Sequence, residues 1–448
     1  MTSAVLHRTT RFVPKKAVGG NGSYLFLEDG TKFLDSTGGA AVSCLGHGNE
    51  QVSQAIFDQL KQVEYCHTAF FGTEVSEELA RFLIDSSGGK LSKLYVVSSG
   101  SEAVEAALKL SRQYFLELPT PQPQRTRFIA RKPSYHGITL GALGAGGHVF
   151  RREPFEPLLS QNTSHVSPCY AYRGKTDNES DENYVARLAN ELDAEFRRVG
   201  PETVCAFIVE PVVGAALGCV PAVPGYFRAM KSICEKHGAL FIFDEVMSGM
   251  GRCGTLHAWE QEGVIPDLQA IGKALGGGYA PVSGLLISDK IVQAIDKGTG
   301  GFRHGQTYQG HPVSCAAALA VQRTIRDEGL LENVRRMGAY LEERLREVLG
   351  GIEYVGDIRG KGLFWGIEFV KDKATKEPFS PEAAVAFQIQ ETGLKPEYGI
   401  SLYTAAGTVD GVRGDHAILA PAYNVTKEEI DIIVEMTAQV LKEVFAQV

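Results

Sequence analysis

A lysine placed between an apolar run and three glycines could act as a nucleophile. Residues 267–284 read DLQAIGKALGGGYAPVSG, so Lys273 follows an apolar stretch and precedes Gly276, Gly277 and Gly278. The apolar residues draw the backbone into a core, and the glycines let chain or ligand approach closely. Because burial lowers the pKa of a lysine, we expect Lys273 to react as a neutral amine.

Carboxylates stand at the ends of two other apolar runs. Asp244 and Glu245 follow ALFIF, and Glu210 ends CAFIVE. A carboxylate at the end of a buried strand needs a cation or hydrogen-bond donors to offset its desolvation. The residues alone leave two interpretations open, a structural ion pair or a ligand site.

Two further turns offer contacts to a ligand. The turn 98–101 (SSGS) precedes a predicted helix and presents hydroxyls, backbone N–H groups and a helix dipole to an anion such as phosphate. Tyr135 also follows an apolar strand, where it could stack on a flat ring or be an ordinary half-buried tyrosine. His136 has no second histidine at metal-ligand spacing, so we expect an orienting or core role and no metal site.

Taken together, these groups suit a phosphate-bearing aromatic aldehyde. Such a ligand needs an amine for imine formation, a carboxylate for its ring nitrogen, an anion cradle and a stacking partner. Pyridoxal phosphate matches that description.

The segments that must position these residues alternate between strand and helix. Strands are predicted at 94–97, 205–210 and 239–243, and helices follow the first two at about 99–115 and 225–237. This alternation predicts an α/β fold with a mainly parallel sheet, whose ligands bind at the carboxyl ends of the strands.

Composition narrows the class of protein. The 448 residues are 44% hydrophobic and 22% charged, with a net charge of -8 and a pI of about 5.8. An acidic balance disfavours nucleic acid as a partner and favours a small molecule. The eight cysteines show no zinc spacing, and no apolar run approaches the ~18 residues of a membrane span. We therefore expect reduced thiols, no membrane partner and a cytoplasmic protein.

Six motifs resemble one known family. SSGSEAVEAALKLSRQY, SYHG, FIVEPVVGA, FDEVMSGMGRCG, IGKALGGGYAPVSG and HGQTYQGHPVSCAAALA occur in the order found in the class III (ω-type) aminotransferases, a group of fold-type I pyridoxal-phosphate enzymes. The resemblance runs over about residues 20–440. It implies a large cofactor-binding domain at 65–325 and a smaller α+β domain built from both termini, 1–64 and 326–448.

The resemblance also implies roles for individual residues. Lys273 is similar to the lysine that holds the cofactor as a Schiff base and transfers the substrate proton, and Asp244 to the partner of the pyridinium nitrogen. Glu210 is similar to a glutamate that supports the residues around the cofactor and does not contact the cofactor itself. Thr307 is similar to a phosphate ligand from a neighbouring subunit, which implies a homodimer with shared active sites. The other cofactor contacts implied are Ser99, Gly100, Ser101, Tyr135, His136 and Val246.

Substrate preference depends on three departures from the family pattern. The turn 214–218 (GAALG) lacks the glutamate that relatives using γ-aminobutyrate or ornithine carry, which favours pyruvate over 2-oxoglutarate as acceptor. Arg413 lies close to the position where members of the amine:pyruvate-like branch carry a mobile arginine that binds the substrate carboxylate. Ala41 stands where some relatives have a large aromatic, and Phe70 is expected in the apolar wall of the pocket.

The predicted activity is therefore transfer of an amino group from an amine or amino acid to a keto acid. Relatives with the same motifs catalyse racemisation, decarboxylation or amino shifts, and these reactions stay open as alternatives. A nucleotide-binding dehydrogenase built on the glycine run 141–147 would lack the strand and the acidic ribose partner that it needs. A scaffold protein would have no use for Lys273 and Asp244 together.

Overall fold

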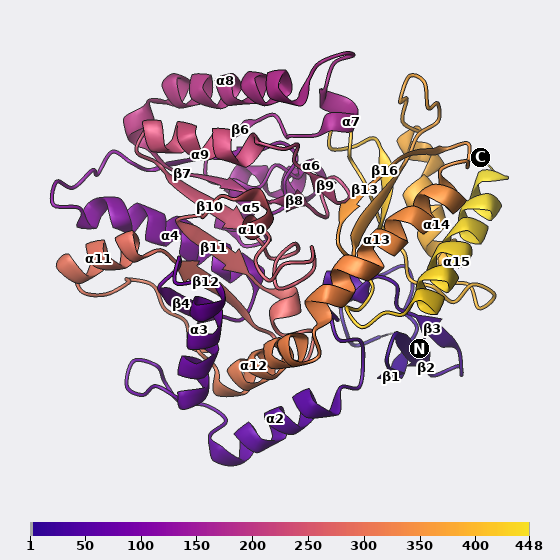
Figure 1. Ribbon diagram of the computed structural model, residues 1–448, viewed down its shortest axis with the longest axis horizontal. Coiled ribbons are helices and arrows are strands. Elements are labelled where there is room, and N and C mark those ends of the chain that lie inside the picture. Colours follow the sequence, from indigo (N-terminus) through magenta and orange to yellow (C-terminus); the bar gives the residue numbers. More distant parts are fainter. Residues whose placement is uncertain (1–2, 448) are drawn as a thin grey trace.

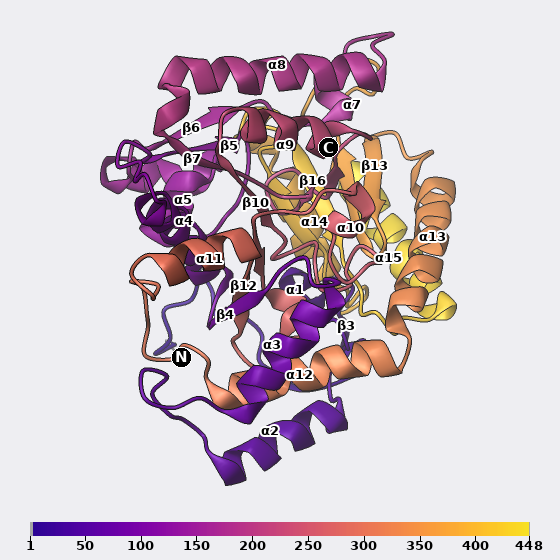
Figure 2. The same ribbon diagram turned by 60° about the vertical axis from the view of Figure 1, so that its left-hand side comes forward.

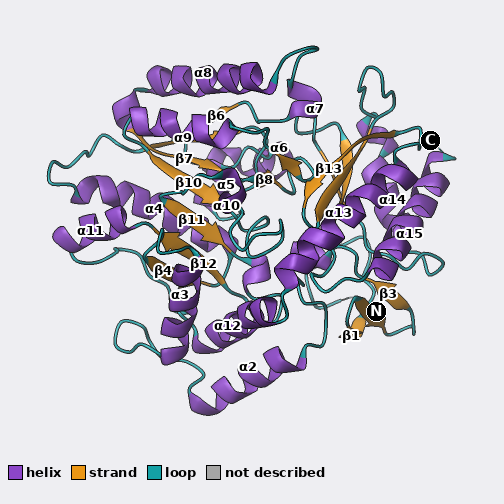
Figure 3. Ribbon diagram, viewed as in Figure 1, coloured by secondary structure: helices purple, strands orange, loops and turns teal. Residues whose placement is uncertain are grey.

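The computed structural model describes residues 3–447. A large mixed sheet lies between two layers of helices, and a smaller sheet with its own helices lies beside it (Figures 1 and 3). This arrangement confirms the predicted α/β fold with a mainly parallel large sheet.

The carboxyl ends of the parallel strands lie along the same side of the large sheet. β12 runs antiparallel to β11 and β4, and the other neighbouring strands of this sheet pair in parallel. The strands, in spatial order, are β4 (Lys93–Val97), β12 (Ser283–Ile287), β11 (Leu268–Ile271), β10 (Leu240–Asp244), β7 (Val204–Val209), β5 (Arg127–Arg131) and β6 (Thr163–Val166).

Successive residues of the central strands pack on opposite helix layers. Ile208 and Ile242 join the apolar cluster of α4 on one face, whereas Phe207 and Phe241 join the cluster of α8 and α9 on the other (Figures 1 and 2). Burial on both faces explains why these strands read as continuous apolar runs. The covering helices are α4 (Gly100–Glu117), α8 (Asp181–Val199) and α9 (Tyr226–Lys236).

The smaller unit joins the two ends of the chain. Leu34 pairs with Ile400, and its N–H donates to the carbonyl of Gly399 at 2.7 Å, so the N-terminal strands lie against the C-terminal segment (Figure 1). This confirms a small α+β unit built from both termini, while its boundaries stay predictions. Its elements are β1 (Ala17–Asn21), β2 (Tyr24–Leu27), β3 (Lys32–Leu34), α13 (Leu330–Leu349), β13 (Val355–Lys361), β14 (Phe364–Phe369), α14 (Val385–Gly393), β15 (Tyr403–Ala406), β16 (Asp415–Leu419) and α15 (Lys427–Phe445).

The remaining elements connect or flank these units. Within the part of the chain that the structure describes, no helix is long and apolar enough to cross a membrane. The other elements are α1 (Gly38–Ala41), α2 (Glu50–Gln62), α3 (Glu74–Ser86), α5 (Leu140–Ala145), α6 (Val149–Arg152), α7 (Ala171–Gly174), β8 (Val212–Val213), β9 (Val220–Pro221), α10 (Trp259–Glu262), α11 (Asp289–Lys297) and α12 (Pro312–Asp327), with short 3-10 turns between them.

Candidate active site

A cavity of about 170 Å³ lies at the carboxyl ends of the parallel strands. Most of its lining was nominated from the sequence. Gly137 and Met247 were not, although each directly follows a nominated residue in its motif, and that adjacency could have identified them. The lining residues are Gly100, Ser101, Tyr135, His136, Gly137, Glu210, Asp244, Val246, Met247 and Lys273.

Strand alternation explains why two carboxylates face this cavity. Glu210 comes two residues after Ile208, and Asp244 two residues after Ile242, so both point to the α4 side of the sheet. Glu245 points elsewhere, and its carboxylate accepts hydrogen bonds from the Ala258 and Trp259 N–H groups at 2.7 and 2.8 Å. Asp244 therefore belongs to the cavity, and Glu245 belongs to the surrounding framework.

Asp244 is held in place by a histidine. His136 Nδ1 lies 2.7 Å from Asp244 Oδ2, and the Val246 N–H donates to Asp244 Oδ1 at 3.1 Å. The His136 ring is fully buried, and its Nε2 has no hydrogen-bond partner within residues 3–447. His136 is thus placed to fix the orientation of the Asp244 carboxylate, and its role in the site stays a prediction.

Glu210 braces the backbone on two sides of the cavity. Its Oε1 accepts from the Tyr135 N–H and its Oε2 from the Gly214 N–H, each at 3.1 Å. Only 4% of the residue is exposed, and burial raises the pKa of its carboxyl, an effect to which Asp244 adds. Glu210 supports the segments around Tyr135 and Gly214.

Lys273 stands just after β11 in an unusual backbone conformation. Its φ of 47° lies in the left-handed region, which costs a non-glycine residue about 1–3 kcal/mol and is typical of functional sites. The Gly276 and Gly277 N–H groups donate to its carbonyl at 3.1 and 3.0 Å. Burial lowers the pKa of the Lys273 ammonium, while Asp244 and Glu210 act in the opposite direction. The lysine is positioned to supply an amine.

The start of α4 supplies an anion-binding end. Ser99 is the N-cap, and its Oγ accepts from the Glu102 N–H at 3.3 Å. The carboxylate of Glu102 accepts from the Ser98 N–H at 2.9 Å, one residue earlier than in a standard capping box. Because Gly100 and Ser101 open the helix and line the cavity, the first N–H groups and the positive end of the dipole are available there.

The lining residues fit pyridoxal phosphate. A β-carbon on Gly100 would stand 2.8 Å from Val246 Cγ1, so glycine is what lets α4 approach the cavity wall so closely. Lys273 offers an amine, Asp244 a carboxylate and the start of α4 an anion cradle, while Tyr135 and Val246 offer flat and apolar contacts.

Five nominated residues do not line the cavity. Thr307 is exposed, and its carbonyl accepts from the Tyr65 hydroxyl at 3.0 Å; Phe70 is 77% exposed. Ala41 is buried in the cluster that contains Met247. The exposed Arg413 donates from Nε to Asp410 at 2.7 Å. Their roles, and that of Ser99 beyond capping α4, stay predictions.

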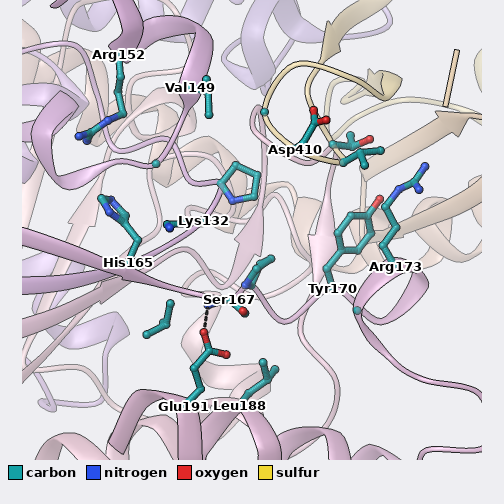
Figure 4. Close-up of a pocket in the computed structure, with 18 of the residues that line it drawn as sticks. Lys132, Val149, Arg152, His165, Ser167, Tyr170, Arg173, Leu188, Glu191 and Asp410 are labelled. Carbon is teal, nitrogen blue, oxygen red and sulfur yellow. Dashed lines mark hydrogen bonds between the residues drawn. The ribbon is translucent and has the colours of Figure 1, made fainter. Parts of the chain in front are cut away.

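A second cleft is larger, with a volume of about 910 Å³, and is lined by a different set of side chains (Figure 4). Two of its labelled charged residues are paired: Glu191 accepts from the Ser167 N–H at 2.8 Å, and Arg173 pairs with Glu368 at 2.6 Å. Arg152 donates to the carbonyls of helix α5. None of the residues nominated from the sequence lines this cleft within the described range, so the smaller cavity is the candidate active site.

Comparison with known proteins identifies the family. The profile described as Aminotransferase class-III matches residues 4–441. The chain belongs to the class III aminotransferases. An aminotransferase of Gibberella zeae is 52% identical over 430 residues, which cover 96% of this chain and 84% of that protein.

Solved structures agree with this assignment. An (S)-enantioselective ω-transaminase from Thermomicrobium roseum is 35% identical, with a TM-score of 0.90 over 97% of this chain and 94% of that chain. The ω-transaminase of Pseudomonas jessenii, solved in complex with PMP, is 29% identical, also with a TM-score of 0.90 and the same coverage. The chain is thus an aminotransferase of fold type I, and this class depends on pyridoxal phosphate.

Proposed function

We propose that this aminotransferase moves an amino group from an amine or amino acid to a keto acid through Lys273, with pyruvate preferred over 2-oxoglutarate. The observation that carries the proposal is the convergence of the Lys273 amine, the Asp244 carboxylate and the start of α4 on one cavity. These three groups match the aldehyde, the ring nitrogen and the phosphate of the cofactor.

Different residues would hold the ring and the phosphate of the cofactor. Asp244 would pair with the ring nitrogen, and His136 keeps that carboxylate oriented. Ser99, Gly100 and Ser101 would hold the phosphate at the start of α4. The ring would be flanked by Tyr135 and Val246, and Thr307 of a second copy of this chain would complete the phosphate contacts in a homodimer.

When bound, pyridoxal phosphate supplies an aldehyde carbon that condenses with amines and a ring that accepts electrons from the substrate carbon. Lys273 contributes proton transfer at its Nζ. Because burial lowers its pKa, the amine can lose its proton and then accept one from the substrate carbon that bears the amino group. The Asp244 carboxylate is held at the cavity by His136 Nδ1 and the Val246 N–H, which both bond to it.

Substrate preference follows from the turn 214–218. Gly214 packs against Met247, which lines the cavity, and the turn contains no acidic residue. An acceptor with a single carboxylate is therefore favoured over one that needs a second charged contact. Ala41 would leave room for a bulky donor, Phe70 would form part of the apolar wall and Arg413 would bind the substrate carboxylate after leaving Asp410.

The test is substitution of the lysine. The wild-type holoenzyme should show a visible absorbance band, lose it on adding an amine, and release one keto acid or aldehyde per amino group transferred. Lys273→Ala should abolish both the band and turnover while keeping the fold by circular dichroism. Full turnover in this variant would refute the proposal. Carbon dioxide release, or inverted amine without keto product, would instead support decarboxylation or racemisation.

A further inference from the structure

An arginine of α6 lies over the tyrosine that walls the cavity. The guanidinium carbon of Arg151 is 5.0 Å from the centre of the Tyr135 ring. The His148 ring meets the same tyrosine edge-on, with centroids 6.3 Å apart and planes at 78°. Tyr135 lines the cavity, so Arg151 and His148 contact one of its wall residues, although neither is a lining residue itself.

Arg151 has no anionic partner within residues 3–447. No carboxylate oxygen lies within 4.0 Å of its guanidinium, and its buried Nε has no hydrogen-bond acceptor. The next residue differs, because Arg152 pairs with Glu156 at 3.1 Å and donates to the carbonyl of Gly144 at 2.8 Å. A guanidinium that has no anionic partner and lies beside a wall residue of the cavity can serve an anionic ligand.

The surroundings favour an anion at this point. His148 does not compete for one, because burial and then the nearby Arg151 lower its pKa to about 4 and leave it neutral at neutral pH. Other charges that act on Tyr135 are Asp244, inside the cavity, and the arginine Arg8. Arg413 lines a separate, mainly apolar groove and is paired with Asp410.

The two arginine-bearing segments also touch. Val149 of α6 packs against the backbone of Gly411, where a β-carbon would stand 2.3 Å from its Cγ2. Gly411 belongs to the tight loop 407–414 that carries Arg413, closed by the Gly407 N–H to Gly414 carbonyl bond at 2.7 Å. A shift of this loop would therefore displace α6 through the contact between Gly411 and Val149.

We propose that Arg151 joins Arg413 in binding the carboxylate of the keto-acid and amino-acid substrates, as a specificity-determining residue beside Tyr135. The inference rests on the proposed transaminase function and deepens it. A guanidinium presents a planar fork of N–H groups that matches a carboxylate bidentately, and stacking on a tyrosine holds that fork in orientation. Substrates without a carboxylate would gain nothing from it.

The experiment compares charged and uncharged substrates in the holoenzyme. Arg151→Gln should raise the KM for pyruvate about 10- to 100-fold, the loss expected for one charge-assisted contact, with a much smaller change in kcat. The KM for 1-phenylethylamine, which has no carboxylate, should change far less, so the ratio of the two KM values rises. In Arg151→Lys, which keeps the charge but loses the planar fork of N–H groups, the KM for pyruvate should lie between those of the wild type and Arg151→Gln.

A binding measurement separates recognition from turnover. Calorimetric titration with 3-phenylpropanoate, an unreactive carboxylate, should show binding to wild type and a similar 10- to 100-fold loss in Arg151→Gln. Arg346→Gln is the matched control, because it removes one charge from an exposed pair on α13. Unchanged pyruvate KM and unchanged carboxylate affinity in Arg151→Gln would overturn the inference, as would a loss confined to Arg413→Gln. Failure of the wild type to transfer amino groups from any donor would instead refute the proposed function.

Discussion

Replacing Gly100 by alanine tests the cavity without removing any reactive group. The new β-carbon would stand 2.8 and 3.1 Å from the two Val246 methyl carbons, inside the roughly 3.5–4.0 Å of an unstrained contact. Overpacking of this kind costs about 1–3 kcal/mol. The residue opens α4 without a left-handed φ, so its backbone can accept a side chain.

The steric cost should weaken the binding of the cofactor and hardly change the stability of the apoprotein. Without cofactor, Val246 can move into the cavity of about 170 Å³ and relieve the contact. With cofactor, that space is needed by the ring, so 1–3 kcal/mol corresponds to about 5- to 150-fold weaker binding. Thermal unfolding of the apoprotein should shift by no more than about 2 °C.

The assay is titration of the apoprotein with pyridoxal phosphate, followed by absorbance and protein fluorescence. Gly351→Ala is the matched control, because a β-carbon there meets nothing within 4 Å. In the Val246→Ala background, adding Gly100→Ala should cost little, since the opposing methyl groups are gone. Wild-type affinity in Gly100→Ala, or an equal loss in both backgrounds, would refute the close-approach argument.

Two further predictions concern buried charges. Burial acts to raise the pKa of Glu368, but Arg359 and Arg173 hold it below the ordinary value. Glu368→Gln should therefore destabilise the apoprotein by about 3–5 kcal/mol in urea unfolding. The Thr408 hydroxyl donates to Glu368 at 3.0 Å, so hydrogen exchange in the Thr408 loop should rise, and unchanged exchange would contradict a stabilising contact between this loop and Glu368. Burial lowers the pKa of His257 from 6.5 to about 4. Its contribution to stability, about 3 kcal/mol, is therefore present above pH 6.5 and lost as the pH falls towards 4. His257→Gln should flatten the fall in melting temperature between pH 7 and 5, and an identical slope would exclude this source.

Several local features could be predicted because their causes are local. The apolar residues of 330–349 recur at helical spacing, and Leu330, Val334, Met337, Leu341 and Leu345 among them are buried in α13. Ser99 precedes the predicted helix and does cap it. The residues after β7, β10 and β11 were nominated because an α/β sheet gathers the carboxyl ends of its parallel strands.

Other features depend on contacts that cross the chain. His136 and Asp244 are 108 residues apart, and their hydrogen bond depends on β10 lying beside β7 and β7 beside β5. The stacking of Arg151 on Tyr135 and the pairing of Arg413 with Asp410 depend on how helix α6 and loop 407–414 fold back. No periodicity or motif carries that information.

The sequence by itself determined which segments are strands and helices and which reactive side chains stand at strand ends, because side-chain patterning acts over a few residues. The motifs also identified the family and its cofactor. Only the tertiary structure decided that Lys273, Asp244 and Gly100 share one cavity, that Glu245 faces away and that Arg151 lies over the ring of Tyr135. These outcomes depend on strand order, register and loop packing, which are set by burial of distant segments against one another.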